Sequence, residues 1–360
     1  MTNKFTRQKE SITIAADITL PEVADGGRNW IPLDEYKGSI NGGNHTISRL
    51  RIHKSTNCIG FVAQLKDGGK IENLKFVNAK VMDSGTHSYI GIVAGKCSSG
   101  GTITNCLVDE TSEVSGFDIV GGIVGQSEGG LNDDSSPALT RISNCQNRAK
   151  VSGTSTTANA YVGGIVGFMQ YSVVERCSNY GAVSSGNSAG GIAGLLKNSV
   201  AMACLNEGSI TGKEGVGGIA GKMSYSDNTI SELAVIVACG NEGGVSGTKS
   251  VGGVVGDKTS GFIYAAWTTD TEEIEANGTI PGTKDGSGKS NSSNDALSGD
   301  EAAVNAQVAT MNGQITTDYN TQLLDNTNQY VYIGGKDFWT CNYQWAAGNL
   351  TYPTLIIPSN

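Results

Sequence analysis

The chain has few of the residues that metal centres, membrane spans and long helices require. Among 360 residues there are 6 prolines, 3 histidines and 6% aromatic residues. No C-x-x-C pair and no H-E-x-x-H motif occurs, which argues against a zinc site of either common type. No apolar run approaches the roughly twenty residues of a membrane-spanning helix, so we expect no span.

Positive charge is also scarce. Lys and Arg number 25 against 34 Asp and Glu, a net charge of -9. Nucleic acid and anionic membranes are therefore poor partners, since both attract a cationic face. The opening MTNKFTRQKE lacks the apolar centre of a signal peptide, so an export signal, if one exists, lies outside this chain.

Glycine is abundant, with 51 residues, and much of it lies in one recurring motif. A single VGGIVG could be a phosphate-binding loop, but such a loop needs one copy between a strand and a helix. This motif recurs with a shortest spacing of 27 residues, which is typical of a repeat architecture. Its copies begin at Ile59, Ile90, Val120, Val162, Ala189, Val216 and Val251.

A second motif, C-x-N-x-G-x-V-x-G, lies between the glycine motifs. Its defined positions fall on every second residue, which is the period of a strand. Cys, Asn and Val then face inward, while Gln146, Arg148 and Lys150 face water. The glycine motif breaks this period and indicates a corner, where glycine permits a positive φ or a close approach.

These periods predict an all-β fold, a right-handed parallel β-helix (a solenoid) with an N-terminal cap and a C-terminal α/β capping segment. Each turn would hold two or three strands: one in the glycine motif, one through the Cys-Asn motif and, in the three-strand alternative, one between them. Seven turns stacked at about 4.8 Å give a column roughly 34 Å long. Each turn buries its inward residues only against its neighbours.

The cysteines and asparagines of the second motif are predicted to be structural. Five cysteines share one slot, and Leu74 occupies that slot in an earlier repeat, so we expect buried free thiols rather than disulfides. The asparagines would hydrogen-bond to one another or to the backbone of their own turn, because a buried amide needs partners. The five cysteines are Cys106, Cys145, Cys177, Cys204 and Cys239.

The two ends depart from the repeat, and four segments are expected. Residues 1–37 would form an N-terminal cap and residues 38–282 the β-helix. Residues 283–299 read as a polar linker, and residues 300–360 as a C-terminal capping segment that opens with a short helix to Met311.

The chain resembles bacterial surface proteins that carry GLUG repeats. The opening from Ile12 to Ile52, with ITIAADITL, NWIPL and YKGSINGGNHTISRLRI, is similar to the first module of such proteins. The GGIVG copies match the central motif of the family, and TYPTLI at Thr351 looks like its closing segment. The resemblance covers nearly the whole chain.

The resemblance implies a secreted or surface-anchored bacterial protein, such as the stalk of an adhesin or of an immunoglobulin-cleaving metallopeptidase. The peptidase activity of that family resides in a separate zinc domain. Since H-E-x-x-H is missing, the activity is not carried over. We therefore expect an extracellular, non-catalytic, monomeric β-helix that binds a glycan or a host-cell protein.

A carbohydrate-active enzyme, a polysaccharide lyase or glycoside hydrolase, is the alternative, because parallel β-helices also perform that chemistry. Glycoside cleavage wants two carboxylates about 5 to 10 Å apart across a groove. The candidates are scattered over Asp17, Asp34, Asp133, Asp134 and Glu272, Glu273 and Glu275. None of them recurs at strand spacing beside a basic residue.

Two insertions are the predicted binding site. From the glycine motif to the next cysteine the chain runs 20 residues after Gly125 and 18 after Gly221, against 10 in the two turns between them. Both would leave the column at the same corner, three turns apart. Their carboxylates, amides and one ring suit sugar hydroxyls or a calcium ion, the one cofactor considered. The predicted site comprises Asn132, Asp133, Asp134, Tyr225, Asp227 and Asn228. Plain surface decoration is the competing interpretation of both insertions.

Overall fold

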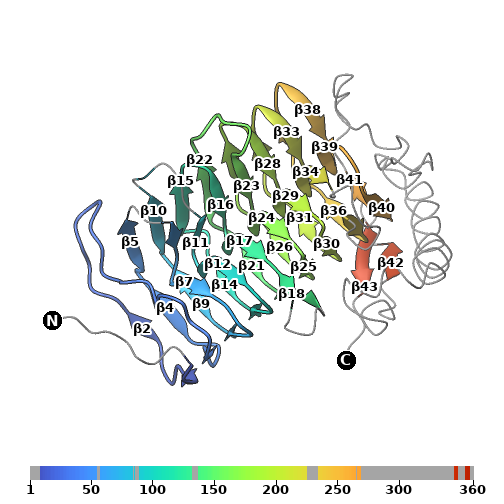
Figure 1. Ribbon diagram of the computed structural model, residues 1–360. Helices are drawn as coiled ribbons and strands as arrows, with labels where there is room; N and C mark the ends of the chain where they lie inside the picture. The colour runs from blue at the N-terminus through green and yellow to red at the C-terminus, as the bar shows by residue number, and fades with distance from the viewer. Residues whose placement is uncertain are drawn as a thin grey trace.

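The computed structural model describes residues 9–54, 57–83, 85, 89–131, 137–224, 234–264, 266–268, 344–347 and 353–356. These residues form strands and connections without a helix, in a single parallel β-helix (Figure 1). No helix that could cross a membrane is found among them. The predicted linker 283–299 and the predicted helix to Met311 lie outside the described residues.

Five parallel sheets run along the column, and each turn contributes one strand to each sheet. Sheet I contains β1 (Ile12–Thr13), β3 (Ser39–Asn41), β8 (Lys70–Glu72), β13 (Thr102–Thr104), β20 (Thr140–Ser143), β25 (Ser172–Glu175), β30 (Val200–Met202), β35 (Val235–Val237) and β40 (Phe262–Tyr264). Sheet II contains β2 (Ile18–Thr19), β4 (Thr46–Ser48), β9 (Lys75–Val77), β14 (Leu107–Val108), β21 (Gln146–Asn147), β26 (Ser178–Asn179), β31 (Leu205–Asn206), β36 (Gly240–Asn241) and β41 (Trp267–Thr268). Sheet III contains β5 (Arg51–Lys54), β10 (Lys80–Asp83), β15 (Glu113–Gly116), β22 (Lys150–Gly153), β27 (Val183–Ser185), β32 (Ile210–Thr211) and β37 (Val245–Ser246).

The glycine motifs build the other two sheets. Sheet IV contains β6 (Cys58–Ile59), β11 (Tyr89–Gly91), β16 (Ile119–Gly121), β23 (Tyr161–Gly163), β28 (Ser188–Gly190), β33 (Glu214–Gly217) and β38 (Lys249–Gly252). Sheet V contains β7 (Val62–Leu65), β12 (Ala94–Ser98), β17 (Val124–Glu128), β24 (Val166–Gln170), β29 (Ala193–Lys197), β34 (Ala220–Ser224) and β39 (Val255–Lys258). Two antiparallel hairpins lie outside the coil, β18 (Gly130–Leu131) with β19 (Pro137–Ala138) and β42 (Gln344–Ala347) with β43 (Pro353–Ile356).

The seven predicted repeats are seven complete turns, and their register is the predicted one. Val120 pairs with Ile90 on one side and with Val162 on the other. The later starts continue the column, with Ala189 beside Val162 and Val251 beside Val216. The parallel β-helix is therefore confirmed. Inside and outside also follow the prediction, since Ile192 is fully buried and Lys150 is exposed.

The prediction of two or three strands per turn is wrong, because each turn has five short strands. The Cys-Asn motif is divided between sheets II and III, and the glycine motif between sheets IV and V. At the corner from sheet I to sheet II the residue before the cysteine slot adopts a positive φ in every turn from the second to the seventh. These residues are Asn73, Asn105, Asn144, Arg176, Ala203 and Ala238, with φ between 51° and 57°. None of these residues is glycine, so each pays the steric cost of the left-handed conformation, roughly 1–2 kcal/mol per residue.

The glycines of the motif serve close approach rather than positive φ. A Cβ on the first glycine, as at Gly121, would collide with the carbonyl oxygen of Val124. A Cβ on the last, as at Gly167, would lie 2.8 Å from the backbone nitrogen of Val120 in the turn before. The middle glycine faces the core, where a Cβ on Gly164 would meet the amide of Asn179. Each motif glycine thus makes room for a different neighbour.

The inward asparagines form the predicted ladder. Asn147 Nδ2 donates to Asn179 Oδ1 at 2.8 Å, and Asn179 Nδ2 donates to Asn206 Oδ1 at 2.8 Å. Asn206 continues to Asn241 at 2.7 Å, where Thr268 Oγ1 accepts the last bond at 3.1 Å. Each Nδ2 also donates to the carbonyl two residues ahead, as from Asn179 to Gly181 at 2.9 Å. The fully buried amides are therefore satisfied along the column and within their own turn.

The N-terminal segment extends the coil. Strands β1 and β2 add parallel partners to β3 and β4, and Leu33 and Tyr36 form bridges with Val62 and Leu65 of β7. Trp30 stacks on Phe61, with ring centroids 4.7 Å apart, and its Nε1 donates to the Phe61 carbonyl at 2.9 Å. These contacts cover the first turn.

Candidate functional site

The predicted binding residues Asn132, Asp133, Asp134, Tyr225, Asp227 and Asn228 lie outside the described residues. The structure does describe the strands from which the two insertions leave. The first follows β17 and the second follows β34, both in sheet V, and both rejoin the coil in sheet I. Three strand steps separate β17 from β34, about 14 Å. The predicted common corner is thus present, and the hairpin of β18 and β19 lies within the first insertion.

A second surface, which the sequence reasoning missed, lies where the outer sides of sheets IV and V converge. We call it the outer crease. Because alternation turns Val120 into the core, Gly121 faces outward, and its missing side chain lets the backbone of sheet V approach. A Cβ on Gly167 would likewise lie 2.9 Å from Cγ2 of Ile119 in the turn before. Only glycine at these positions lets the backbones of the two sheets approach so closely at this corner.

Outward side chains line both walls of the outer crease. On sheet IV, Tyr89, Ile119 and Tyr161 occupy one column on three successive turns. On sheet V, the facing column holds Lys96, Gln126 and Phe168. The walls touch, since the rings of Tyr161 and Phe168 are 6.0 Å apart at their centroids and Lys96 Nζ lies 5.8 Å from the centre of the Tyr89 ring. The three rings and Ile119 are partly buried and partly open to solvent.

One polar group in the outer crease has an unused acceptor. The side chain of Gln126 is 6% exposed, and its Nε2 donates to Glu128 Oε2 at 3.5 Å. Its Oε1 is buried without a hydrogen-bond partner. Glu128 also binds Lys96, with Nζ and Oε2 2.5 Å apart, so this ammonium and this carboxylate neutralise one another. A buried unsatisfied carbonyl oxygen costs roughly 1–3 kcal/mol and favours a donor from outside.

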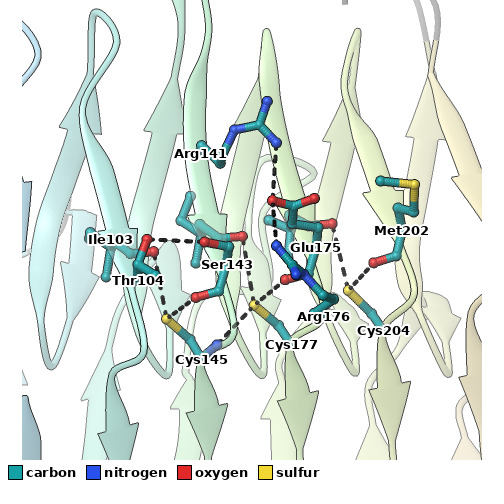
Figure 2. Close-up of polar contacts among 12 residues, drawn as sticks. Ile103, Thr104, Arg141, Ser143, Cys145, Glu175, Arg176, Cys177, Met202 and Cys204 are labelled. Atoms are coloured by element: carbon teal, nitrogen blue, oxygen red, sulfur yellow. Dashed lines mark hydrogen bonds and ion pairs between the residues drawn. The ribbon is translucent and has the colours of Figure 1, made fainter. Parts of the chain in front are cut away.

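The cysteine slot lies at the corner from sheet I to sheet II, where Figure 2 shows Cys145, Cys177 and Cys204 beside one another. All five slot cysteines are free and buried, which confirms the predicted thiol ladder. Each thiol donates to the carbonyl two residues before it, as from Cys145 Sγ to Ser143 at 3.3 Å and from Cys177 Sγ to Glu175 at 3.3 Å. The Cys177 sulfur in turn accepts the backbone N–H of Cys145 at 3.4 Å. The ladder therefore ties consecutive turns together.

Burial controls the protonation of two of the slot thiols. Burial raises the pKa of Cys177 and of Cys204 well above the ordinary 9.0, because the interior disfavours a thiolate. Burial likewise raises the pKa of Cys58 to about 11. A thiol held in its protonated form is a poor nucleophile and a poor metal ligand. The ladder is structural.

A charged cluster lies on the outer side of sheet I, beside the thiol ladder (Figure 2). Glu175 Oε1 accepts from Arg141 Nη1 at 3.1 Å and from Arg176 Nη2 at 3.4 Å, and the side chain of Glu175 is 8% exposed. Arg176 is also one of the positive-φ corner residues. The two guanidinium groups compensate the buried carboxylate, so the cluster joins the fourth turn to the fifth.

Two features of the surface are relevant to the enzymatic alternative, a pair of glutamates and a groove. Glu207 and Glu242 follow the ladder asparagines of adjacent turns, and partial burial, then the charge of Glu207, raises the pKa of Glu242. A groove of about 200 Å³ lies elsewhere, beside sheet III, where Arg51, His53, Lys80 and Glu113 line it. Within the described part of the chain, no group of three or more His, Cys, Asp or Glu side chains could hold a metal ion.

Comparisons with known proteins give two similarities. No family model matches the chain. The chain is 30% identical over 162 residues to halomucin of Haloquadratum walsbyi. This match covers 40% of the chain and 2% of halomucin. The chain is also similar to a crystal structure from Bacteroides ovatus that is described as a candidate immunoglobulin A1 protease. The two chains are 24% identical, and their superposition covers 76% of each with a TM-score of 0.49.

Proposed function

We propose that this protein is an extracellular, adhesin-like β-helix that presents its outer surface to a glycan or a host-cell protein and performs no catalysis. The observation that carries the proposal is the common corner of the two long insertions, which leave sheet V three strands apart. Loops on a rigid scaffold are where binding residues concentrate. The GLUG-like motifs and the local similarity to halomucin support a surface or secreted protein.

The interior supports a scaffold role. Its slot cysteines are free, buried and hydrogen-bonded, its ladder asparagines are satisfied, and a continuous apolar cluster fills much of the rest of the core. In the described part of the chain, these cysteines and asparagines are buried and are hydrogen-bonded to one another and to the backbone. Binding chemistry is therefore expected on the outside of the column, in loops and on outward side chains.

The test shortens each insertion to the direct connection between the fourth and fifth turns, where β24 ends at Gln170 and β25 begins at Ser172. We expect native circular dichroism and unfolding midpoints, with a loss of binding to cells or to a glycan array. The matched control shortens the connection 154–160, which is long but lies at another corner, between β22 and β23. Full binding by both insertion variants would place the recognition face elsewhere.

A carbohydrate-active enzyme is the second candidate, favoured by the Glu207 and Glu242 pair. A carboxyl with a raised pKa beside a second carboxyl is an arrangement that general acid catalysis uses. If the pair is catalytic, the parent releases new reducing ends or unsaturated products from a polysaccharide, and Glu242→Gln abolishes the release. Equal release by Glu242→Gln and the parent, or none from either, would exclude this role.

A further inference from the structure

We propose that the outer crease binds a neutral, extended saccharide chain along the axis of the column. The inference rests on the proposed function, because it names a ligand class and a surface for the same adhesive role. The outer crease is a different surface from the two insertions. The binding residues would be Tyr89, Ile119 and Tyr161 on sheet IV, with Gln126 and Phe168 on sheet V.

The spacing of the rings fits a polymer. Tyr89 and Tyr161 lie two strand steps apart, about 10 Å, with Ile119 between them in the same column. An aromatic or branched apolar side chain covers the apolar face of a sugar ring, so consecutive turns offer consecutive contacts. The contacts follow the axis because each column is in register from turn to turn.

The polar groups of the outer crease select a neutral ligand with hydroxyl groups. Gln126 Oε1 is a buried acceptor that lacks a donor, and it lies in register between Lys96 and Phe168. A sugar hydroxyl can donate the hydrogen bond that this oxygen lacks. The ion pair of Lys96 with Glu128 leaves no net charge beside it, so neither an anionic nor a cationic polymer is favoured.

The repeat itself supplies substitutions that the fold already accepts. Ser188 follows Tyr161 in the sheet IV column, and Leu195 follows Phe168 in the sheet V column. Tyr161→Ser therefore removes a ring, and Gln126→Leu removes the acceptor, with residues that the next turns contain. The matched control is Tyr180→Glu, because Tyr180 is an outward ring over Arg148 on another face and Glu207 follows it one turn later.

The experiment titrates the full chain with neutral cello-, xylo-, manno- and laminari-oligosaccharides by calorimetry, and measures cell adhesion in parallel. We expect one of these series to bind, Tyr161→Ser to weaken binding about tenfold, and Gln126→Leu to weaken it several-fold. Tyr180→Glu and the two insertion-shortened variants should bind the oligosaccharide as the parent does. All variants are first compared by unfolding midpoint.

Four outcomes separate this inference from the proposed function. Oligosaccharide binding and adhesion that the crease variants both retain overturn the crease site and leave the adhesive role standing. Oligosaccharide binding that depends on Tyr161, without cell adhesion, supports the crease and overturns the adhesive role. Neither binding nor adhesion overturns both. Binding lost only on shortening the insertions assigns the sugar to them and overturns the crease site.

Discussion

The first turns and the last turns fill the same interior positions with opposite chemistry. In the first turn Phe61 packs edge-on against Phe76 of the next, with ring centroids 5.5 Å apart. The position of Phe61 holds a glycine from the third turn on, and the position of Phe76 holds an asparagine of the ladder in the fourth to seventh turns, as in Gly191 with Asn206 of the next turn. The other such pairs are Gly122 with Asn147, Gly164 with Asn179 and Gly218 with Asn241.

The difference shows that glycine and asparagine are chosen together. The amide needs the space that the glycine leaves, whereas two apolar side chains fill the same space by themselves. Apolar pairs tolerate sliding of one turn against another better than a polar ladder does, since an amide out of register loses its partner. We therefore interpret the later turns as specified by hydrogen bonds and the first turns as specified by packing.

The largest effect is expected when the early residue type is placed in a late turn. Gly191→Ile introduces the residue that stands at Ile92, but its Cβ would meet the amide of Asn206 and the carbonyl of Gly218. We expect a loss on the order of 4 kcal/mol in the free energy of unfolding, measured with urea. The control Ile92→Leu should cost less than about 1.5 kcal/mol. Similar losses in the two variants would remove the distinction between the regions.

A smaller effect is expected from breaking the ladder without overpacking it. Asn206→Leu leaves the Asn179 amide without its acceptor and the Asn241 oxygen without its donor, at about 1–3 kcal/mol for each group. The matched change in the third turn, Val108→Ile, should cost less than about 1.5 kcal/mol.

The double variant Asn179→Leu with Asn206→Leu sharpens the same test. It should cost less than the sum of the single changes, because the shared hydrogen bond is lost only once. Additive losses, measured by urea unfolding, would mean that the amides do not act as a ladder.

The smallest expected effect is a pH dependence confined to the cysteine turns. Burial raises the folded pKa of Cys177 and Cys204 above the ordinary 9.0, so the unfolded chain loses these protons first. The stability they contribute is complete below about pH 9 and declines as the pH rises beyond it. Urea unfolding at pH 7.5 and pH 10 should show a steeper decline for the parent than for Cys177→Ala with Cys204→Ala. Identical declines would mean that the thiols ionise as easily folded as unfolded.

Much of the fold could be predicted because it depends on local periods. The stacking of Val120 on Val162, the inward asparagines and the free cysteines all follow from motifs that recur along the chain and from the alternation of residues within each motif. The five-strand turn could not be predicted in the same way. The corners at Arg176 and Ala203 carry no glycine or asparagine, and only the neighbouring turns hold those residues at positive φ.

The candidate sites also contain a part that the local periods predict and a part that they do not. The repeat, the inside and outside of each strand and the corner from which both insertions leave follow from the order of the residues, because a β-strand fixes the direction of every second side chain. The convergence of the outer sides of sheets IV and V is found in the folded chain alone, where it brings Tyr161 against Phe168 and buries Gln126 beside them. That angle results from backbone contacts between successive turns, made possible by Gly121 and Gly167, and no period along one strand encodes it.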